Sequence, residues 1–148
     1  MRIALPLAFA LLALAPPAPA GEPAPRKLSR EDLAGAAFAD PAARVKQERG
    51  EGGAYQTRDL EAFRSPDGRF DAGVYESGAT RLTVSEPYGV DEFMYFLEGS
   101  VTLTSPDGTS LAVGAGEAVI VPRTWRGVFE TGGYRKIYVI FSPDEPIE

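Results

Sequence analysis

The stretch from Asp91 to Val128 places the strongest limits on how this chain of 148 residues can fold. It reads DEFMYFLEGSVTLTSPDGTSLAVGAGEAVIVPRTWRGV, a series of short apolar runs separated by turn residues. Pro106-Asp107-Gly108 is a tight-turn sequence, because proline presets one backbone angle and glycine accepts a positive φ. Similar runs, bounded by turn residues about every 8 to 12 positions, extend from Phe70 to Phe141. This spacing predicts an all-β sandwich or barrel.

Two of the predicted strands lack the alternation of a strand with one face in water. Residues 93–97 (FMYFL) and 137–141 (IYVIF) are apolar without a break. An antiparallel sheet that is wetted on one face alternates apolar and polar residues instead. Both faces of these strands must therefore be covered, either by the N-terminal segment or by a second subunit. Our hypothesis is a homodimer that forms through sheet packing.

The first 20 residues have the layout of a secretory signal peptide. Arg2 supplies the positive start, and Ile3 to Ala15 is an apolar stretch that is too short to span a membrane. Ala18-Pro19-Ala20 matches a cleavage site, so we expect the mature chain to begin at Gly21 and to have the length of one domain. This predicts export to the periplasm or out of the cell, without membrane insertion of the mature protein. The alternative is an uncleaved membrane anchor.

Charge and residue content exclude several classes of protein. Acidic residues outnumber basic ones by 21 to 15, and no basic cluster stands out, which argues against binding to nucleic acid or to anionic membrane surfaces. The chain contains no cysteine and no histidine. It therefore has no disulfide, no Ser-His-Asp triad, no thiolate nucleophile and no zinc site of nitrogen and sulfur ligands.

The segment before the predicted strands reads as a Pro-rich linker followed by a short helical arm. Ser29 and Asp32 match a capping box, which predicts the start of a helix. That helix should end before Pro41, because the residue that precedes a proline resists helical backbone angles. Residues 48–53, ERGEGG, predict a loop.

A joint pattern of glutamate, glycine, proline and tryptophan positions runs through the predicted strands. Its members are Glu92, Leu97-Glu98-Gly99, Asp107-Gly108, Gly114 to Glu117, Pro122, Trp125-Arg126-Gly127 and Arg135 to Val139. The pattern resembles that of the cupin β-barrels, and more narrowly the family that contains ureidoglycine aminohydrolase-type and ethanolamine-utilisation-type cupins. The resemblance implies a single jelly-roll cupin barrel over residues 63–148, preceded by a linker and a short helical N-terminal arm over residues 21–62. It also implies ureide or amine metabolism.

Most cupins, as the resemblance implies, hold a metal through two histidines and a glutamate in one motif and a third histidine in the next. The four aligned positions in this chain are Glu86, Tyr88, Glu92 and Gly127. A slip of one residue would exchange the first two for Ser85 and Pro87. Oxygen ligands alone suit hard cations such as magnesium or manganese. We therefore expect no metal cofactor, or at most weakly held manganese or magnesium on Glu86, Tyr88 and Glu92.

Strand alternation extends this set to a predicted barrel pocket. If Glu92 faces the interior, Met94 faces it too, and the same argument links Gly127 with Trp125 and Arg123. The predicted ligand-binding residues are Glu86, Tyr88, Glu92, Met94, Arg123 and Trp125. A carboxylate, a phenol and an indole on apolar walls are typical of a small-molecule site.

Several of these residues also have a plainer interpretation. Glu86 precedes a proline in a turn-like stretch, where the alternative is a solvated side chain. For Arg123 the alternative is a surface ion pair, and for Trp125 it is core packing. Glu92 begins an apolar strand and so needs a partner, for which the alternative to a cavity is an arginine at the barrel rim.

Three classes of function follow from these observations. The first is a module that binds or senses a small polar molecule in the barrel. The second is an aminohydrolase, lyase or isomerase that uses Glu86, Tyr88 and Glu92, since two nearby carboxylates can act as an acid/base pair. The third is a barrel that presents a protein-binding surface. We favour the first, because the ureidoglycine enzymes, as the family implies, hold manganese partly through histidine, and because export fits intracellular nitrogen catabolism poorly.

Overall fold

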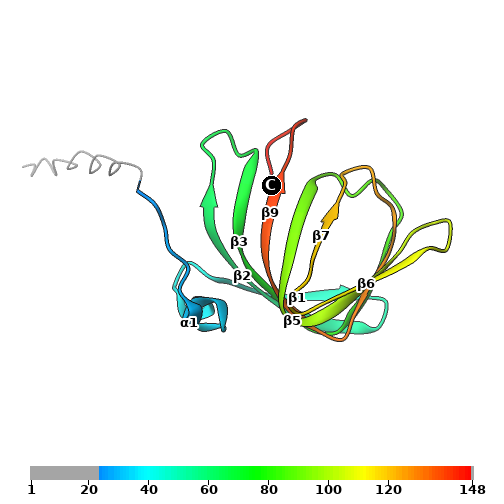
Figure 1. Cartoon of the computed structure of the whole chain (residues 1–148), viewed down its shortest axis with the longest axis horizontal. Coiled ribbons are helices and arrows are strands. Elements are labelled where there is room, and N and C mark those ends of the chain that lie inside the picture. The colour runs from blue at the N-terminus through cyan, green and yellow to red at the C-terminus, as the bar shows by residue number, and fades with distance from the viewer. Residues whose placement is uncertain (1–23, 148) are drawn as a thin grey trace, which may run out of the picture.

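The computed structural model describes residues 24–147, so the predicted signal peptide lies outside the described residues. Nine strands follow a short helical arm and curve into a barrel (Figure 1). In chain order the elements are α1 (Arg30–Leu33), the 3-10 helix η1 (Ala36–Ala39), β1 (Arg44–Gly50), β2 (Gly53–Arg64), β3 (Phe70–Ser77), β4 (Thr80–Val84), β5 (Asp91–Thr104), β6 (Ser110–Gly114), β7 (Ala118–Val121), β8 (Gly127–Thr131) and β9 (Tyr134–Phe141). The predicted all-β barrel is confirmed.

The long strand β5 joins the two sheets of the barrel. Its first part pairs with β9 and β7, in the larger sheet that continues through β3 and β2 to β1. Its second part pairs with β6 and β8 in the smaller sheet, where β8 also pairs with β4. Among the turn residues expected to separate the apolar runs are Glu98 and Gly99, but β5 runs through them with a register shift between Phe96 and Glu98. Gly99 has a φ of 72°, and a Cβ there would lie 2.0 Å from the Gly133 carbonyl oxygen, so only glycine fits this crossing.

The sheet begins earlier in the chain than the sequence predicted. Residues 44–62 were expected in the arm and residues 48–53 in a loop, yet β1 and β2 form a hairpin in which Gly50 pairs with Gly53. Strand β1 is a polar edge strand, mostly exposed, and it lacks the apolar alternation that marks a half-buried strand. Pairing with β2 holds it in place, and Arg44 adds cross-strand ion pairs to Asp59 and Glu61 at 3.0 and 3.1 Å.

The arm before β1 forms the predicted capping box. The Asp32 amide donates to Ser29 Oγ at 3.1 Å, and the Ser29 amide donates to Asp32 Oδ2 at 2.8 Å. The chain then continues as η1, because Gly35 adopts a φ of 118° and ends α1. The arm lies against β2, with the Arg58 guanidinium 4.7 Å from the centre of the Phe38 ring. No helix among residues 24–147 is long and apolar enough to cross a membrane.

The core lies inside the barrel, where the two sheets face each other. Its buried members are Met94, Phe96, Val101, Leu103, Val113, Val121, Phe129 and Tyr134. The ring of Tyr134 packs against Phe96 and Phe129, at 5.4 and 5.9 Å between ring centres. Alternation along β5 is as predicted: Glu92 is buried like its inward neighbours Met94 and Phe96, while Phe93 and Tyr95 are exposed.

Candidate functional site

A cavity of about 370 Å³ lies inside the barrel, on the inner face of the larger sheet. One wall is apolar and consists of Leu82 and Val84 from β4 and Phe129 from β8. The opposite wall carries tyrosines and charged side chains from β1, β2, β3, β9 and β5. A ligand in this cavity would therefore meet hydrocarbon on one side and hydrogen-bonding groups on the other.

Strand register decides which side chains meet on the charged wall. Asp71 on β3 lies opposite Ile140 on β9, which in turn lies opposite Glu92 on β5, so these three share one row across the sheet. Tyr75 and Lys136 face each other in a row closer to the barrel core. Residues in such rows point to the same face of the sheet. Chain segments that are far apart in sequence thus supply one continuous wall.

The centre of the site is a hydrogen-bonded network of Tyr88, Glu92 and Lys136. Lys136 Nζ donates to Glu92 Oε1 at 2.6 Å, and the Tyr88 hydroxyl donates to Glu92 Oε2. Glu92 is 4% and Lys136 6% exposed, so this ion pair lies almost entirely out of water. The Lys136 ammonium also lies 5.3 and 5.6 Å from the ring centres of Tyr75 and Tyr134, which provide cation–π contacts. The buried carboxylate is therefore neutralised and both of its oxygens are occupied.

The phenols around this network keep their protons. Burial raises the pKa of Tyr88 well above its usual value, and the neighbouring Glu92 carboxylate raises it further. Burial likewise raises the pKa of Tyr75 and of Tyr134. Neutral phenols can donate and accept hydrogen bonds, whereas phenolates only accept. The network thus keeps its donors at physiological pH.

A second polar group lies at the β1–β2–β3 end of the cavity. Tyr138 donates to Asp59 Oδ1 at 3.1 Å, reaching across Gly73. A Cβ at Gly73 would lie 2.7 Å from the Tyr138 hydroxyl, so the glycine makes room for this ring. Arg64 Nη2 donates to Asp71 Oδ2 at 2.9 Å. Burial raises the pKa of the Asp71 carboxyl, although the bond from Arg64 acts in the opposite direction.

The structure brings two of the six predicted ligand-binding residues, Tyr88 and Glu92, to the cavity. Glu86 does not line it, because the loop before Tyr88 turns this side chain into solvent, and the predicted carboxylate pair of Glu86 and Glu92 is not assembled there. Met94 is fully buried in the core, one row beyond Glu92.

Arg123 and Trp125 also lie away from the cavity lining. Arg123 forms an ion pair with Asp144 at 3.4 Å, and the two side chains are 39% and 77% exposed. Trp125 lies behind Tyr88, with the two rings 6.2 Å apart at 72°, and its Nε1 donates to Ser105 Oγ at 3.1 Å. The tryptophan therefore supports the Tyr88 ring from outside the cavity.

Sequence reasoning missed most of the charged wall. Lys136 was given no role in the pocket, although Tyr134, Lys136 and Tyr138 alternate with the outward residues and could have been found by their period of two. Asp71 and Arg64 carry no such signal, because only the pairing of β2, β3 and β9 brings them beside Glu92.

The residues at the four positions that align with cupin metal ligands do not fit a metal ion. Both oxygens of Glu92 are already bound, and the Lys136 ammonium supplies the positive charge that a cation would bring. Glu86 is exposed, and a Cβ at Gly127 would lie 2.2 Å from the Thr104 carbonyl oxygen, so no side chain can take the last position. Residues 24–147 contain no group of three acidic, histidine or cysteine residues placed to hold a metal.

Comparison with known families assigns this fold. The EutQ-like cupin domain family matches residues 64–138, which is half of the chain. The protein belongs to the EutQ-like cupin domain family. This confirms the predicted cupin jelly roll, while the narrower likeness to ureidoglycine aminohydrolases stays a prediction. No curated protein matches the chain.

Solved structures resemble this cupin in fold. A DUF861-family protein of unknown function from Pseudomonas syringae has a TM-score of 0.59 at 22% identity; the match covers 66% of this chain and only 44% of that protein. The EutQ protein of Clostridium difficile has a TM-score of 0.54 at 21% identity, over 68% of this chain and 82% of that one. A putative ethanolamine utilization protein Q from Salmonella typhimurium has a TM-score of 0.50 at 18% identity, over 69% and 97%. At these identities the likeness shows the fold alone.

Proposed function

We propose that this cupin binds a small polar molecule in the barrel cavity and holds it without a metal ion. The observation that carries the proposal is the buried Tyr88–Glu92–Lys136 network, which opens onto a cavity of about 370 Å³. That volume lies in the range of small-molecule sites, roughly 300–1,000 Å³. A buried ion pair and apolar walls in one cavity are the makeup of such a site.

The chemistry of the network indicates which group of a ligand it would hold. An ammonium has three N–H donors, and Lys136 gives one of them to Glu92. The remaining donors suit an acceptor oxygen of the ligand, such as a carboxylate or a carbonyl oxygen. Leu82, Val84 and Phe129 on the facing wall suit a short hydrocarbon body. We therefore propose a small carboxylate or carbonyl compound as the ligand class.

We propose binding rather than catalysis because the predicted acid/base pair lacks one of its members. Glu86 is exposed away from the cavity, and Glu92 is tied to Lys136 and Tyr88. An aminohydrolase, lyase or isomerase mechanism with barrel carboxylates would need a second free acid beside Glu92, whereas the other carboxylates of the cavity, Asp59 and Asp71, are bound by Tyr138 and Arg64. Turnover of any small carboxylate by the purified protein, detected by NMR, would overturn this preference.

A cavity-filling variant tests the binding proposal. Val84→Phe adds a ring to the apolar wall of the cavity, whereas Thr83→Phe places the same ring on the exposed face of the same strand. The probes are acetate, butyrate, hexanoate and their amides. A ligand at a hundredfold its dissociation constant stabilises a protein by about 2.7 kcal/mol, which raises the Tm of a chain of this size by roughly 10 °C.

We expect at least one probe to raise the Tm of the wild type and of Thr83→Phe, and none to raise that of Val84→Phe. The Tm of each variant without probe shows that it is folded. Equal shifts in both variants would place the binding elsewhere, and no shift with any probe would contradict the proposal.

Elemental analysis tests the absence of a metal cofactor. We expect purified protein to carry less than stoichiometric metal and its Tm to stay unchanged in manganese or magnesium, because Lys136 already neutralises Glu92. Stoichiometric metal that disappears in Glu92→Gln would contradict the proposal.

We further propose that the protein is exported. The support is the sequence of residues 1–20, with its apolar stretch and its Ala18-Pro19-Ala20 site. N-terminal sequencing of the protein from fractionated cells is expected to begin at Gly21 in the exported fraction. A chain that keeps Met1 in the cytosol would contradict export.

A further inference from the structure

The cations of the cavity lining outnumber its acids by one. Each acid of the lining is bound to a cation of the lining, in the pairs Arg44–Asp59, Arg64–Asp71 and Lys136–Glu92. Lys46 on β1 is the remaining cation, and it has no ion pair among residues 24–147. The lining therefore carries one positive charge that none of its own side chains neutralises.

Two acids outside the lining leave the charge of Lys46 in place. Glu61 contacts Arg44 and Arg64 at 3.1 and 2.9 Å, so its negative charge lies with these two guanidinium groups. Glu48 is on the same side of β1 as Lys46, but no ion pair joins the two. With Glu61 counted, the charges around the cavity sum to zero, but the positive one at Lys46 stands apart from the negative one at Glu61.

Lys46 lies where the cavity meets solvent. Its register partner on β2 is Thr57, which is 4% exposed, so Lys46 is on the inner side of β1. The lysine itself is nevertheless exposed. A lysine in such a place lays its hydrocarbon stem along the wall and keeps its ammonium in water. A carboxylate bound there would stay partly hydrated, which keeps the cost of removing it from water low.

The inner end of the cavity favours a neutral acceptor instead. Lys136 Nζ lies 2.6 Å from Glu92 Oε1, in an ion pair that is neutral as a whole. A ligand carboxylate at this end would lie beside the Glu92 carboxylate, and two like charges in one buried site repel each other. A ketone or aldehyde oxygen accepts from the free N–H groups of Lys136 without adding a charge. The two ends of the cavity therefore select different groups of a ligand.

Strand register sets the distance between the two ends. One row across β9, β3, β2 and β1 consists of Lys136, Tyr75, Asp59 and Arg44. Lys46 is two residues from Arg44 on the same side of β1. Three strand spacings are about 14 Å at the backbone, and the length of both lysine side chains shortens the gap between the two ammonium groups. We therefore expect a ligand of a few carbon atoms to reach both lysines.

We propose that Lys46 forms a carboxylate-binding subsite at the mouth of the cavity, so that the cavity takes small oxo acids. The ketone or aldehyde oxygen of the ligand lies at Lys136, its carboxylate at Lys46, and its hydrocarbon against the apolar wall of Leu82 and Val84. This inference rests on the proposed function and names its ligand class.

Three probes of the same length separate the two ends of the ligand. The first, 4-oxopentanoate, has both groups, whereas pentanoate lacks the ketone and 2-pentanone lacks the carboxylate. In titrations followed by amide NMR, we expect 4-oxopentanoate to bind about two- to fivefold more tightly than 2-pentanone, which is the gain from an ion pair that is open to solvent. It should also bind more tightly than pentanoate by a similar factor, because pentanoate offers no acceptor to Lys136.

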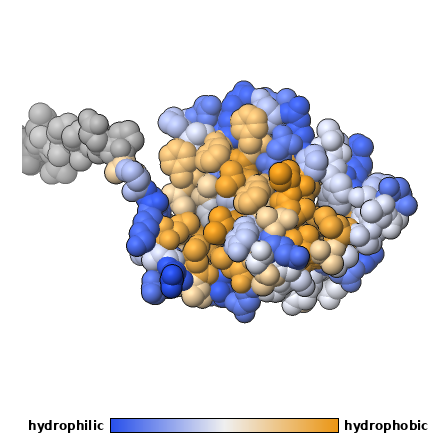
Figure 2. All heavy atoms as spheres, viewed as in Figure 1, coloured by the Kyte–Doolittle hydropathy of each residue, from blue (hydrophilic) through white to orange (hydrophobic). Residues whose placement is uncertain are grey.

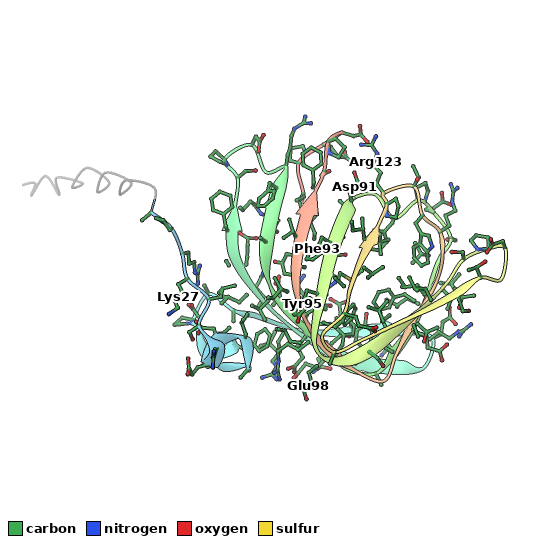
Figure 3. All side chains as sticks on the ribbon, viewed as in Figure 1. Lys27, Asp91, Phe93, Tyr95, Glu98 and Arg123 are labelled. Carbon is green, nitrogen blue, oxygen red and sulfur yellow. The ribbon has the colours of Figure 1, made fainter. Side chains whose placement is uncertain are left out.

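Substitutions of Lys46 test the subsite itself. In Lys46→Met, 4-oxopentanoate should bind no better than 2-pentanone, while the affinity for 2-pentanone stays as in the wild type. Lys46→Arg keeps the charge and should keep the preference for the carboxylate. The matched control is Lys27→Met, because Lys27 is an exposed lysine on the arm (Figure 3), outside the cavity lining, and its loss should leave the preference intact.

The outer face of the larger sheet is the other place where an apolar probe could bind. Phe93 and Ile120 are 41% and 69% exposed there, and Figure 2 shows hydrophobic side chains gathered across the middle of the molecule. Ile120→Ser removes the most exposed of these side chains and should leave the affinities for all three probes unchanged. A loss of probe binding in Ile120→Ser would place the probes outside the cavity and overturn the inference.

Salt gives a readout that a merely structural role of Lys46 would not move. The advantage of 4-oxopentanoate over 2-pentanone should shrink as the ionic strength rises from about 0.01 M to about 1 M, because the screening length falls from about 30 Å to about 3 Å. The affinity for 2-pentanone should not change in this way, since the probe carries no charge. An advantage that is independent of salt would contradict an ion pair at Lys46.

The outcomes distinguish this inference from the proposed function. If the probes bind and 4-oxopentanoate has no advantage over 2-pentanone, or keeps it in Lys46→Met, the subsite is overturned and the proposed function stands. If Lys46→Met weakens both probes equally, the lysine stem and not its charge is responsible, which also overturns the subsite. If no probe binds, the result counts against both the subsite and the proposed function.

Discussion

The inner and outer faces of β5 and β9 are both rich in apolar side chains, but they are covered in different ways. On the inner face, Met94 and Phe96 pack in the core, and Glu92 is paired with Lys136. On the outer face, Phe93 and Tyr95 remain 41% and 37% exposed. The two faces belong to alternate residues of the same strands, so their chemistry differs at every step along the chain.

This difference between the two faces indicates which role each of them can take. The inner face has its charges neutralised within the chain, and the space left over is a cavity suited to a small molecule. The arm lies against β2 and, at Gly35, beside the Arg135 side chain of β9, and it leaves Phe93, Tyr95 and Ile120 exposed on the outer face (Figure 1). A sheet with both faces apolar therefore needs two separate coverings, and residues 24–147 supply one of them.

The largest expected effect comes from removing the positive charge of the inner face. Lys136→Met would leave Glu92 buried with Tyr88 as its remaining partner, and breaking a buried ion pair in this way costs about 3–5 kcal/mol of unfolding free energy. Urea denaturation at pH 7 measures this loss. Glu130→Gln, which removes an exposed partner of Arg81, is the control and should cost less than about 1 kcal/mol. A loss below that level in Lys136→Met would mean that Glu92 is well solvated.

A pair of neighbouring truncations compares the two faces directly. Met94→Ala removes a fully buried side chain and should lower the unfolding free energy by about 2–5 kcal/mol. Phe93→Ala, one residue away on the outer face, should cost the monomer less than about 1 kcal/mol, because its ring is already partly in water. Urea titrations at low protein concentration separate this effect from dimer dissociation. Equal losses would show that the outer face is packed within the monomer.

The smallest effect concerns the phenols of the inner face at high pH. Burial raises the pKa of Tyr75, Tyr88, Tyr134 and Tyr138 above the usual value of 10.0. Well below pH 10 these phenols are neutral in both the folded and the unfolded chain, so their contribution to stability is complete. As the pH rises further, the unfolded chain ionises first and stability falls, by about 0.4 kcal/mol for each phenol at pH 10.

Absorbance at 295 nm measures this difference between the folded and unfolded states. The folded protein should ionise fewer of its six tyrosines than the chain in urea at the same pH above 10. Identical titration curves would show that the inner-face phenols are open to water. The comparison is cleanest in Tyr95→Phe, which removes the tyrosine of the outer face.

Local signals in the sequence were sufficient for much of the fold. The capping box at Ser29, the Pro106-Asp107-Gly108 turn and the inward direction of Glu92 follow from neighbouring residues, and the structure confirms them. The hairpin of β1 and β2 could not be predicted in this way. Its first strand is polar on both faces, so its place in the sheet depends on pairing with β2 and not on a pattern of its own.

Only two residues of the candidate site could be predicted from the sequence. Tyr88 and Glu92 belong to a motif with recognisable spacing, and both line the cavity. Met94, Arg123 and Trp125 were assigned by alternation, which gives the face of a strand but not the depth of a side chain or its neighbours. Lys136 lies 44 residues from Glu92 along the chain, and no local pattern links the two.

The sequence by itself determined the cupin barrel, the absence of histidine ligands and the alternation that separates Glu92 from Phe93. These depend on residue type and on a period of two, which are local properties. Only the tertiary structure decided that Lys136 neutralises Glu92, that Asp71 lies in the same row, and that five strands align an apolar row on the outer face. Each of these depends on the register between strands that are distant in the chain, and register is set by packing of the whole barrel.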